Sequence, residues 1–223
     1  PDPSGTQRRD GSFQGETTTK KMSPEGPART PRGAAETATP APDAAAAATS
    51  AAPDDGEPRW MTLTWFLKND RYEGEVVGGH MHGKGTYWHA DGSRYEGSFV
   101  RSQRHGYGEY YFCDGSVYKG DYADGKKAGY GVFTYADRTR YEGTFRDNVK
   151  HGQGLMHYSD GARYTGDYKN GMMHGQGEYV WPNGVKYVGE WEQDERHGFG
   201  QMFFSDNEPA YRARWDRDQR VFQ

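Results

Sequence analysis

Aliphatic residues are scarce in this chain of 223 residues, which contains no isoleucine and only three leucines, Leu63, Leu67 and Leu155. Isoleucine, leucine, valine and phenylalanine together fall well under the ~20% that usually indicates disorder. Aromatic residues nevertheless reach 15%, and glycine numbers 32. Disordered chains are poor in aromatic residues. We therefore expect a thin core in which rings pack on glycines, without a deep aliphatic interior.

Other absences exclude several classes of protein. Cys113 is the only cysteine, so no internal disulfide can form and a reducing compartment is the natural setting. No run of ~20 apolar residues could span a bilayer, and no secretory signal stands at the start. The first residue is proline rather than methionine, which suggests a processed chain or a fragment.

The chain also lacks a basic excess, since its formal net charge is −4. Residues 1–59 carry 7 basic and 9 acidic side chains, which leaves 21 and 23 for the rest, a balance of −2. Nucleic-acid binding normally leaves a basic footprint. We therefore predict no nucleic-acid partner, and simple electrostatic attachment to anionic membranes is disfavoured.

Residues 1–59 are rich in alanine, proline, threonine, glycine and charge, and Phe13 is their only aromatic residue. We interpret them as a disordered Ala/Pro-rich tail. From Trp60 onward a period of 23 residues is visible in two motifs. Tyr-x-Gly begins at Tyr72, Tyr95, Tyr118, Tyr141, Tyr164 and Tyr187, and Gly-x-Gly begins at Gly83, Gly106, Gly129, Gly152, Gly175 and Gly198. A fixed period in this range indicates a repeat architecture.

Each repeat contains two rows of residues spaced by two, which is the period of a strand. In the second repeat the rows are Tyr95, Gly97 and Phe99, then Gly106, Gly108, Tyr110 and Phe112. Turn signals separate the rows at Asp91-Gly92, Asp114-Gly115, Asp160-Gly161 and Asn183-Gly184. The sequence therefore predicts an all-β fold, an elongated single-layer antiparallel β-meander of six 23-residue hairpins.

The glycines of both motifs are expected on the ringed face, where each leaves a gap for a neighbouring ring. The predicted repeat core is Tyr72, Gly74, Tyr95, Gly97, Tyr118, Gly120, Tyr141, Gly143, Tyr164, Gly166, Tyr187 and Gly189. Twelve strands at ~4.8 Å would extend roughly 58 Å.

The second repeat, Arg94-Tyr95-Glu96-Gly97-Ser98-Phe99 followed by His105-Gly106-Tyr107-Gly108-Glu109-Tyr110, resembles the MORN repeat (membrane occupation and recognition nexus). The resemblance divides the chain into a degenerate capping strand over residues 60–71, six repeats over 72–210 and a degenerate half-repeat over 211–223. In the third copy Asp137-Arg138 replaces Asp-Gly, and a distorted turn is expected there.

The sequence gives little indication of catalysis or of metal or phosphate binding. Five histidines recur with the period, but equivalent residues lie two strands apart, roughly 9.6 Å, too far to share a zinc ion. The glycine motifs have no following helix to cradle a phosphate. We therefore predict no enzymatic activity, no metal and no cofactor.

The face opposite the rings carries acidic and aromatic residues whose role the sequence leaves open. The acidic residues make either a solvated face or a ladder for a basic partner, whereas exposed aromatic residues often mark binding sites. Tyr107, Tyr130 and Tyr111 are expected to form a patch edged by Glu109 and Lys84. The candidate partner-binding residues are Tyr107, Tyr111, Tyr130, Trp88, Phe199, Phe203, Glu73, Glu96 and Glu142.

The resemblance implies a protein-interaction scaffold in a cytoskeletal, ciliary or flagellar assembly, and a homodimer could form through unpaired strands at the array ends. The alternative is weak binding to membrane lipid or phosphoinositide, for which Lys126, Lys127, Arg138 and Arg140 are the local candidates. A further alternative is a targeting module of a larger protein with a catalytic domain.

Overall fold

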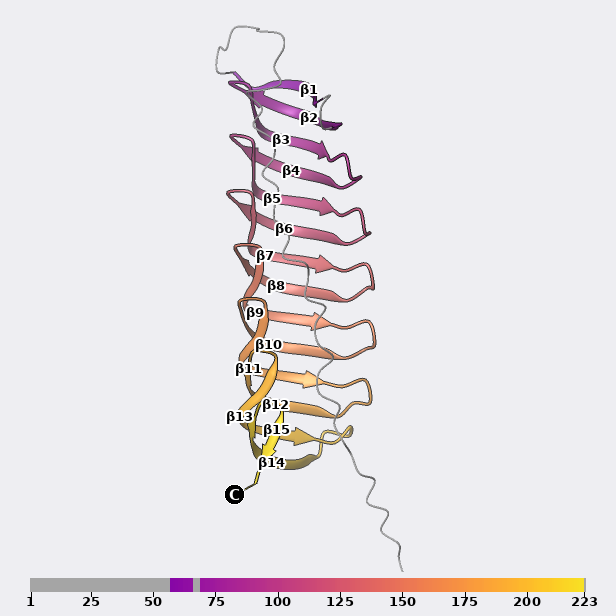
Figure 1. Ribbon diagram of the computed structural model, residues 1–223, viewed down its shortest axis with the longest axis vertical. Helices are drawn as coiled ribbons and strands as arrows, with labels where there is room; N and C mark the ends of the chain where they lie inside the picture. The colour runs from indigo at the N-terminus through magenta and orange to yellow at the C-terminus, as the bar shows by residue number, and fades with distance from the viewer. Residues whose placement is uncertain (1–56, 66–68, 223) are drawn as a thin grey trace, which may run out of the picture.

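The computed structural model describes residues 57–65 and 69–222, in which fifteen antiparallel strands form one sheet in chain order (Figure 1). The strands are β1 Arg59–Trp65, β2 Asp70–Val77, β3 His80–Trp88, β4 Arg94–Val100, β5 Gln103–Tyr111, β6 Val117–Ala123, β7 Lys126–Thr134, β8 Arg140–Arg146, β9 Val149–His157, β10 Arg163–Lys169, β11 Met172–Val180, β12 Lys186–Glu192, β13 Glu195–Phe203, β14 Pro209–Asp216 and β15 Gln219–Val221.

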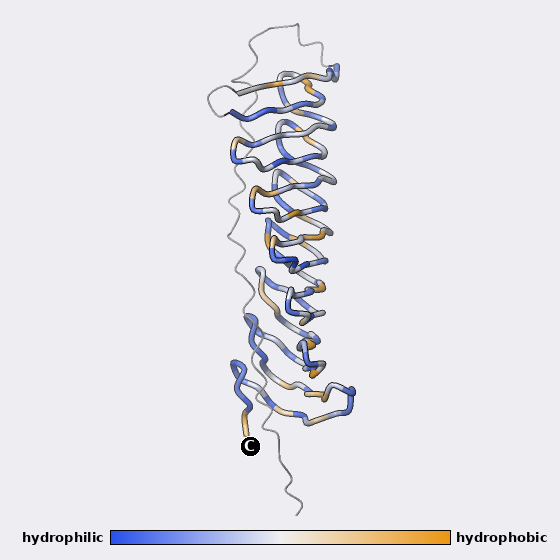
Figure 2. The backbone as a smooth tube through the Cα atoms, turned by 90° about the vertical axis from the view of Figure 1, so that its right-hand side faces the viewer, coloured by the Kyte–Doolittle hydropathy of each residue, from blue (hydrophilic) through white to orange (hydrophobic). Residues whose placement is uncertain are grey.

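The predicted single-layer meander is confirmed. Each 23-residue repeat supplies two paired strands, β1 pairs with β2 at one end, and β14 and β15 form a further hairpin at the other. In the side view each repeat is bent, so the sheet is a trough rather than a flat ribbon (Figure 2). The tail predicted over residues 1–59 falls outside the described residues, except for Glu57, Pro58 and Arg59.

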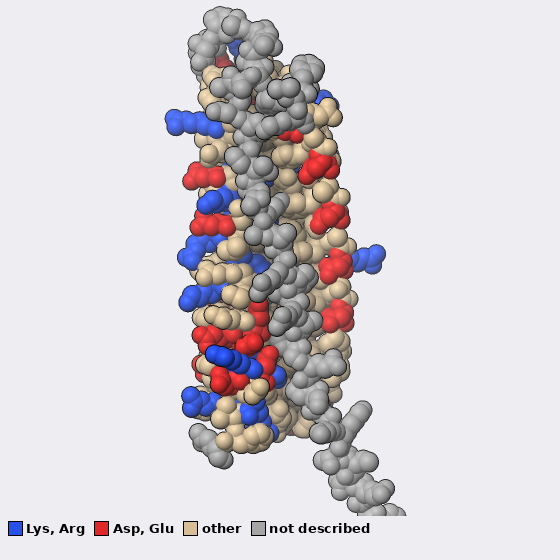
Figure 3. All heavy atoms as spheres, in the orientation of Figure 1, with Lys and Arg blue, Asp and Glu red and all other residues tan. Residues whose placement is uncertain are grey.

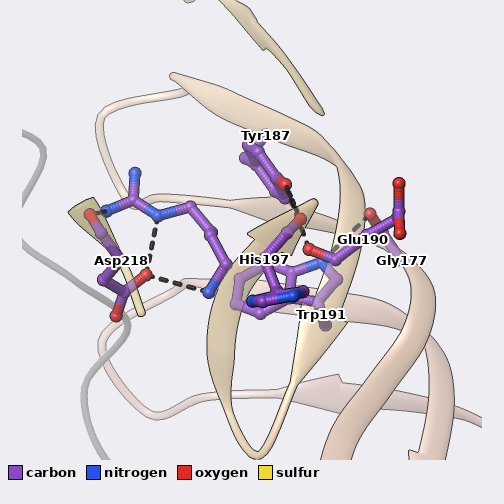
Figure 4. Close-up of polar contacts among 7 residues, drawn as sticks. Gly177, Tyr187, Glu190, Trp191, His197 and Asp218 are labelled. Atoms are coloured by element: carbon purple, nitrogen blue, oxygen red, sulfur yellow. Dashed lines mark hydrogen bonds and ion pairs between the residues drawn. The ribbon is translucent and has the colours of Figure 1, made fainter. Parts of the chain in front are cut away.

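The core lies on the inner face of the trough, where one tyrosine per repeat covers two glycines. A Cβ added at Gly143 would lie 2.6 Å from the Tyr141 Oη atom, and one added at Gly154 would lie 2.5 Å from it. The Tyr141 hydroxyl donates a hydrogen bond to the Thr144 carbonyl at 3.0 Å. Figure 4 shows the same bond in the sixth repeat, from Tyr187 to the carbonyl of Glu190. The bond explains why this position holds tyrosine rather than phenylalanine.

These tyrosines also join the repeats to one another through edge-to-face ring contacts. The Tyr141 ring lies 5.1 Å from Phe145 in its own strand and 5.1 Å from Tyr168 in the next repeat, both near perpendicular. Both contacts recur from the second repeat to the sixth, and in the first, where Val76 replaces the ring of the same strand, Tyr72 keeps only the contact to the next repeat. The result is an unbroken chain of rings, which runs Tyr72, Phe99, Tyr95, Tyr122, Tyr118, Phe145, Tyr141, Tyr168, Tyr164, Trp191, Tyr187 and Trp215. Edge-to-face pairs add to the free energy gained from burial alone.

The first glycine of each Gly-x-Gly motif was predicted to face the rings, and this prediction is wrong. Gly175 has a φ of +60°, and the pairing of β10 with β11 shifts register opposite it. A glycine in this left-handed conformation forms a β-bulge, which bends its strand. A Cβ there would meet the Asp167 carboxylate on the opposite face instead of a ring. The first glycine thus permits the bulge, and only the second glycine belongs to the core.

The turn of the third repeat was predicted to be distorted, and this is also wrong. The Arg138 N–H donates to the Tyr135 carbonyl at 2.9 Å, as the Gly115 N–H does to Phe112 at 3.0 Å in the repeat before. The Asp137 carboxylate accepts the Thr139 N–H at 2.8 Å and fixes the turn. Arg138 therefore takes the glycine conformation, with a φ of +72°.

Two-residue turns within the repeats were not anticipated. Asn170 and Gly171 both have positive φ, at 53° and 87°, and join β10 to β11. This is the type I′ geometry that matches the twist of a hairpin. The Asn-Gly pair is itself a strong sequence signal for such a turn.

A column of residues that begins each second strand lies along the inner face, at 23-residue intervals: Met81, Arg104, Lys127, Lys150, Met173 and Arg196. The cations lie over aromatic rings, with the Lys150 Nζ atom 5.1 Å from the Tyr168 ring and the Arg196 guanidinium 4.1 Å from the Trp215 ring. Burial lowers the pKa of Lys150 to about 8, and the charge of Asp194 opposes this shift. The trough therefore carries positive charge that two of the repeats replace with methionine.

We predict that Gly143→Val lowers the free energy of unfolding by ~3 kcal/mol or more, at the upper end of overpacking costs. The added Cβ would lie 2.6 Å from backbone atoms of Gln153 and Gly154, which cannot move aside. Thr165→Val is the control, since Thr165 is exposed in the middle of β10, and it should change stability by about 0.5 kcal/mol or less. Equal shifts in urea unfolding midpoint would mean that the two faces are wrongly assigned.

Arg138→Gly should stabilise the array by ~1 kcal/mol, because a non-glycine residue in the left-handed region costs about that much. The reciprocal change, Gly115→Arg, places arginine at a φ of +88° in the equivalent turn and should destabilise by a similar amount. Thermal unfolding of the two variants tests this, and shifts of the same sign would contradict it.

Lys150→Met should raise the free energy of unfolding at pH 7 by roughly 1–3 kcal/mol, because it removes the cost of placing a charged ammonium among apolar rings, about 1.4 kcal/mol for each unit by which the pKa is lowered. The pKa of Lys150 is lowered from 10.5 to about 8 on folding, so the unfolded chain binds the proton more tightly between these values. The wild-type penalty is therefore full below pH 8 and fades as pH rises towards 10.5. Urea unfolding at pH 7 and pH 10 should show the advantage of the variant shrinking, whereas Lys169→Met, an exposed site, should show no such trend.

Candidate partner-binding surface

The outer face of the sheet, opposite the ring chain, is where side chains are free of the core. One row on it consists of the residues between the two glycines of each Gly-x-Gly motif, which we call the x row: Lys84, Tyr107, Tyr130, Gln153, Gln176 and Phe199. Tyr107, Tyr130 and Phe199 are 53%, 54% and 69% exposed. These are three of the predicted partner-binding residues, and the structure leaves their rings open to solvent.

The x row faces outward because its backbone is held from the neighbouring strand. The Asp167 carboxylate accepts the Gln176 N–H at 2.9 Å, and the Glu190 carboxylate accepts the Phe199 N–H at 3.0 Å. Glu75 and Asp121 make the equivalent bonds to Lys84 and Tyr130. Four acidic residues on this face therefore anchor the bulge.

The remaining acidic residues of the predicted ladder lie beside basic ones. Glu73 pairs with Arg71 at 2.7 Å, Glu96 with Arg94 at 3.7 Å, and Glu142 with Arg140 at 2.6 Å. Hydrogen bonds from Tyr130 and Arg140 lower the pKa of Glu142. Arginine precedes the repeat tyrosine in four of the six repeats, so the 23-residue period could have revealed this pairing.

Three other candidate rings are covered by cations rather than exposed. The Arg71 guanidinium lies 4.7 Å from the Trp88 ring, Arg94 lies 4.4 Å from Tyr111, and the Lys186 ammonium lies 4.8 Å from Phe203. These pairs sit directly opposite one another on adjacent strands. The aromatic candidates thus divide into an open row and a row capped by positive charge.

Tyr107 and Tyr111 line a hollow of about 410 Å³ on the outer face, together with Trp60, Lys84, Glu96 and Glu109. The hydroxyl of Tyr111 donates to the Glu109 carboxylate at 2.5 Å, and Lys119 pairs with the same carboxylate at 2.7 Å. Lys119 and Tyr111 together lower the pKa of Glu109. Four residues of the predicted patch, Tyr107, Tyr111, Glu109 and Lys84, line this hollow, whereas Tyr130, the fifth, does not. Sequence reasoning missed Trp60, which is 64% exposed and comes from the terminal strand.

The four residues proposed for lipid binding are not brought together. Lys127 is buried on the inner face, Lys126 pairs with Asp147 at one rim, Arg138 lies in a turn at the far end of β7, and Arg140 pairs with Glu142 on the outer face. The four residues are close together in the sequence, but successive side chains of a strand alternate in direction, so Lys126 and Lys127 point to opposite faces. This candidate headgroup site is absent from the described part of the chain.

Charge on the array is of both signs, as Figure 3 shows. A regular column of acidic side chains follows one rim of the array in that view. In the turns, Asp91 and Asp160 accept the backbone N–H groups of Ser93 and Ala162. Over residues 57–65 and 69–222, no three His, Cys, Asp or Glu side chains stand close enough to hold a metal ion. Within the same residues no helix is long and apolar enough to cross a membrane.

Comparison with known proteins agrees with the repeat geometry. The MORN repeat pattern matches residues 72–94, 95–117, 118–140, 141–163, 164–186 and 187–208. No curated protein is similar in sequence.

Solved structures that match this chain at low identity include two domains of CPAP proteins. The TCP domain of SAS-4 (dCPAP) from Drosophila melanogaster, solved with a proline-rich motif of Ana2 (dSTIL), is 12% identical over 72% of this chain and 94% of that chain, with a TM-score of 0.42. The TCP10 domain of Danio rerio CPAP is 10% identical over 73% of this chain and 81% of that chain, with a TM-score of 0.39. No function is carried over from either.

The six family matches cover more than half of the chain, and each contributes two strands of the trough with its tyrosine over two glycines. This chain therefore belongs to the MORN repeat family.

Proposed function

We propose that this chain is a non-catalytic scaffold that binds segments of other proteins along its outer face. The observation that carries the proposal is the pair of Tyr107 and Tyr130, which occupy equivalent places in adjacent repeats and are each about half exposed. Neither ring belongs to the inner core. Aromatic side chains concentrate the binding energy of protein interfaces.

The hollow beside Tyr107 supports the same assignment. It combines aromatic rings with Lys84, Glu96 and Glu109 at its edge, which is the apolar centre and polar rim of an interface. Because the acidic residues of this face are paired or anchor the backbone, we expect the rings, rather than the acidic ladder, to dominate affinity.

A cytoskeletal, ciliary or flagellar setting is part of this proposal, and it rests on membership of a family with members in such assemblies. Self-association through the array ends is also proposed. An end strand such as β1 presents a backbone edge that can pair with another strand. Binding to anionic lipid is the alternative, and it differs from protein binding in its response to salt.

We predict that Tyr107→Ala combined with Tyr130→Ala reduces the capture of partner proteins at least tenfold while leaving the thermal midpoint nearly unchanged, because the two rings serve the interface and not the core. The matched control is Gln153→Ala with Gln176→Ala, which alters the next two residues of the x row. Proximity labelling in the cells that express the protein, quantified by mass spectrometry, measures the change.

Two results would contradict the proposal. If the tyrosine variant unfolds, its rings belong to the core. If both variants keep the same partners, the surface lies elsewhere. Wild-type protein that binds phosphoinositide vesicles tightly at 0.5 M salt would support lipid binding instead, since simple charge attraction is screened at that ionic strength.

A further inference from the structure

The x row has a fixed spacing that selects the shape of a ligand. Equivalent residues in adjacent repeats lie two strands apart, roughly 9.6 Å at ~4.8 Å per strand. Between them on the outer face lie shorter side chains from the intervening strands. Tyr107 is paired with Asp121, and Tyr130 with Thr144. At Tyr107 and Tyr130 the row therefore presents two tall rings with a low gap at Asp121 between them, along the axis of the array.

A polyproline II helix repeats at almost the same distance. It has three residues per turn and a rise of about 3.1 Å per residue, so one turn advances about 9.3 Å. A Pro-x-x-Pro segment laid along the array would place its prolines at successive gaps, in step with Tyr107 and Tyr130. Aromatic surfaces are the usual partners of such segments, because the extended helix is already formed and loses little entropy on binding.

The chain itself contains a segment of this kind outside the described residues. Pro24 and Pro27 have the required spacing, and Pro31 follows. Residues 20–32 carry four basic side chains, Lys20, Lys21, Arg29 and Arg32, against one acidic side chain, Glu25. The hollow beside Tyr107 offers Glu96, whose side chain is 57% exposed, and Glu109. Lys84 also lines the hollow, and the two carboxylates pair with Arg94 and Lys119. Charge therefore contributes little, and the Pro-x-x-Pro spacing is what matches the segment to the row.

The segment can also reach the row. Residues 33–56 separate it from Glu57, the first described residue before β1. Twenty-four residues span up to about 80 Å when extended. The distance from β1 to β7, which carries Tyr130, is six strand steps, roughly 29 Å. The connection is long enough for docking in either chain direction.

We propose that residues 24–32 of this chain dock as a polyproline II helix along the x row at Tyr107 and Tyr130, covering the surface that other proteins bind. This rests on the proposed function, because it assigns an occupant to the same rings. A partner then has to displace the segment, so tail and partner compete for one surface.

The test uses the full chain and its single natural cysteine. Cys113 is exposed and follows Tyr111 by two residues, so a spin label attached there lies near the hollow. The NMR signals of residues 20–32 should lose most of their intensity in the labelled wild-type protein and regain it on reduction of the label. Pro24→Ala with Pro27→Ala, which lies outside the array and cannot unfold it, should restore these signals. Tyr107→Ala with Tyr130→Ala should restore them too, whereas Gln153→Ala with Gln176→Ala should not.

Each other result overturns the proposal. Full intensity in the labelled wild-type protein means that the segment does not dock. Attenuation that persists in the proline variant means a contact made by charge alone, without the polyproline register. If the segment does not dock but the tyrosine variant still loses its cellular partners, the proposed function stands and only the tail assignment fails. If neither tail nor partners respond to the tyrosine variant, both are wrong.

Discussion

The whole array depends on one contact, a tyrosine ring lying across two glycines on paired strands. In the fourth repeat the Tyr141 ring fills the space that a Cβ at Gly143 or Gly154 would need, and its hydroxyl is satisfied by the Thr144 carbonyl. The ring also meets one aromatic residue in its own strand and one in the next repeat. Aromatic residues on glycine can therefore replace an aliphatic interior, which explains how a chain without isoleucine holds a single-layer sheet together.

Because of this contact, the two faces of the sheet have different roles. The inner face is filled by rings and by the cations stacked on them, so it has little surface to offer a partner. The outer face holds the backbone in place with residues such as Asp167, and other acidic residues on it pair with arginine or lysine. What remains variable is the x row, where the fold fixes the position of each side chain but not its identity. A scaffold of identical repeats can thus acquire specificity through a single residue per repeat.

The rigid period adds a constraint on what such a row can bind. Successive x residues are separated by a distance set by hydrogen-bonded strands, not by the side chains themselves. A ligand that repeats at a similar distance gains contacts at every repeat without strain. Extended proline segments have that property, and the docking proposed for residues 24–32 depends on it.

The period, the strand alternation and the tyrosine–glycine core could be predicted from the sequence, because these are local patterns repeated six times. The sequence also placed Tyr107 and Tyr130 on the outer face, since the side-chain period of a strand is two. The role of the first glycine follows only from the folded chain, because a bulge depends on the register of two strands and not on either alone. Strand pairing also explains why the Tyr107 ring is open and the Tyr111 ring is not, since Arg94 covers Tyr111 from the neighbouring strand. Folding also brings Trp60 into the hollow from a terminal strand that carries no repeat motif.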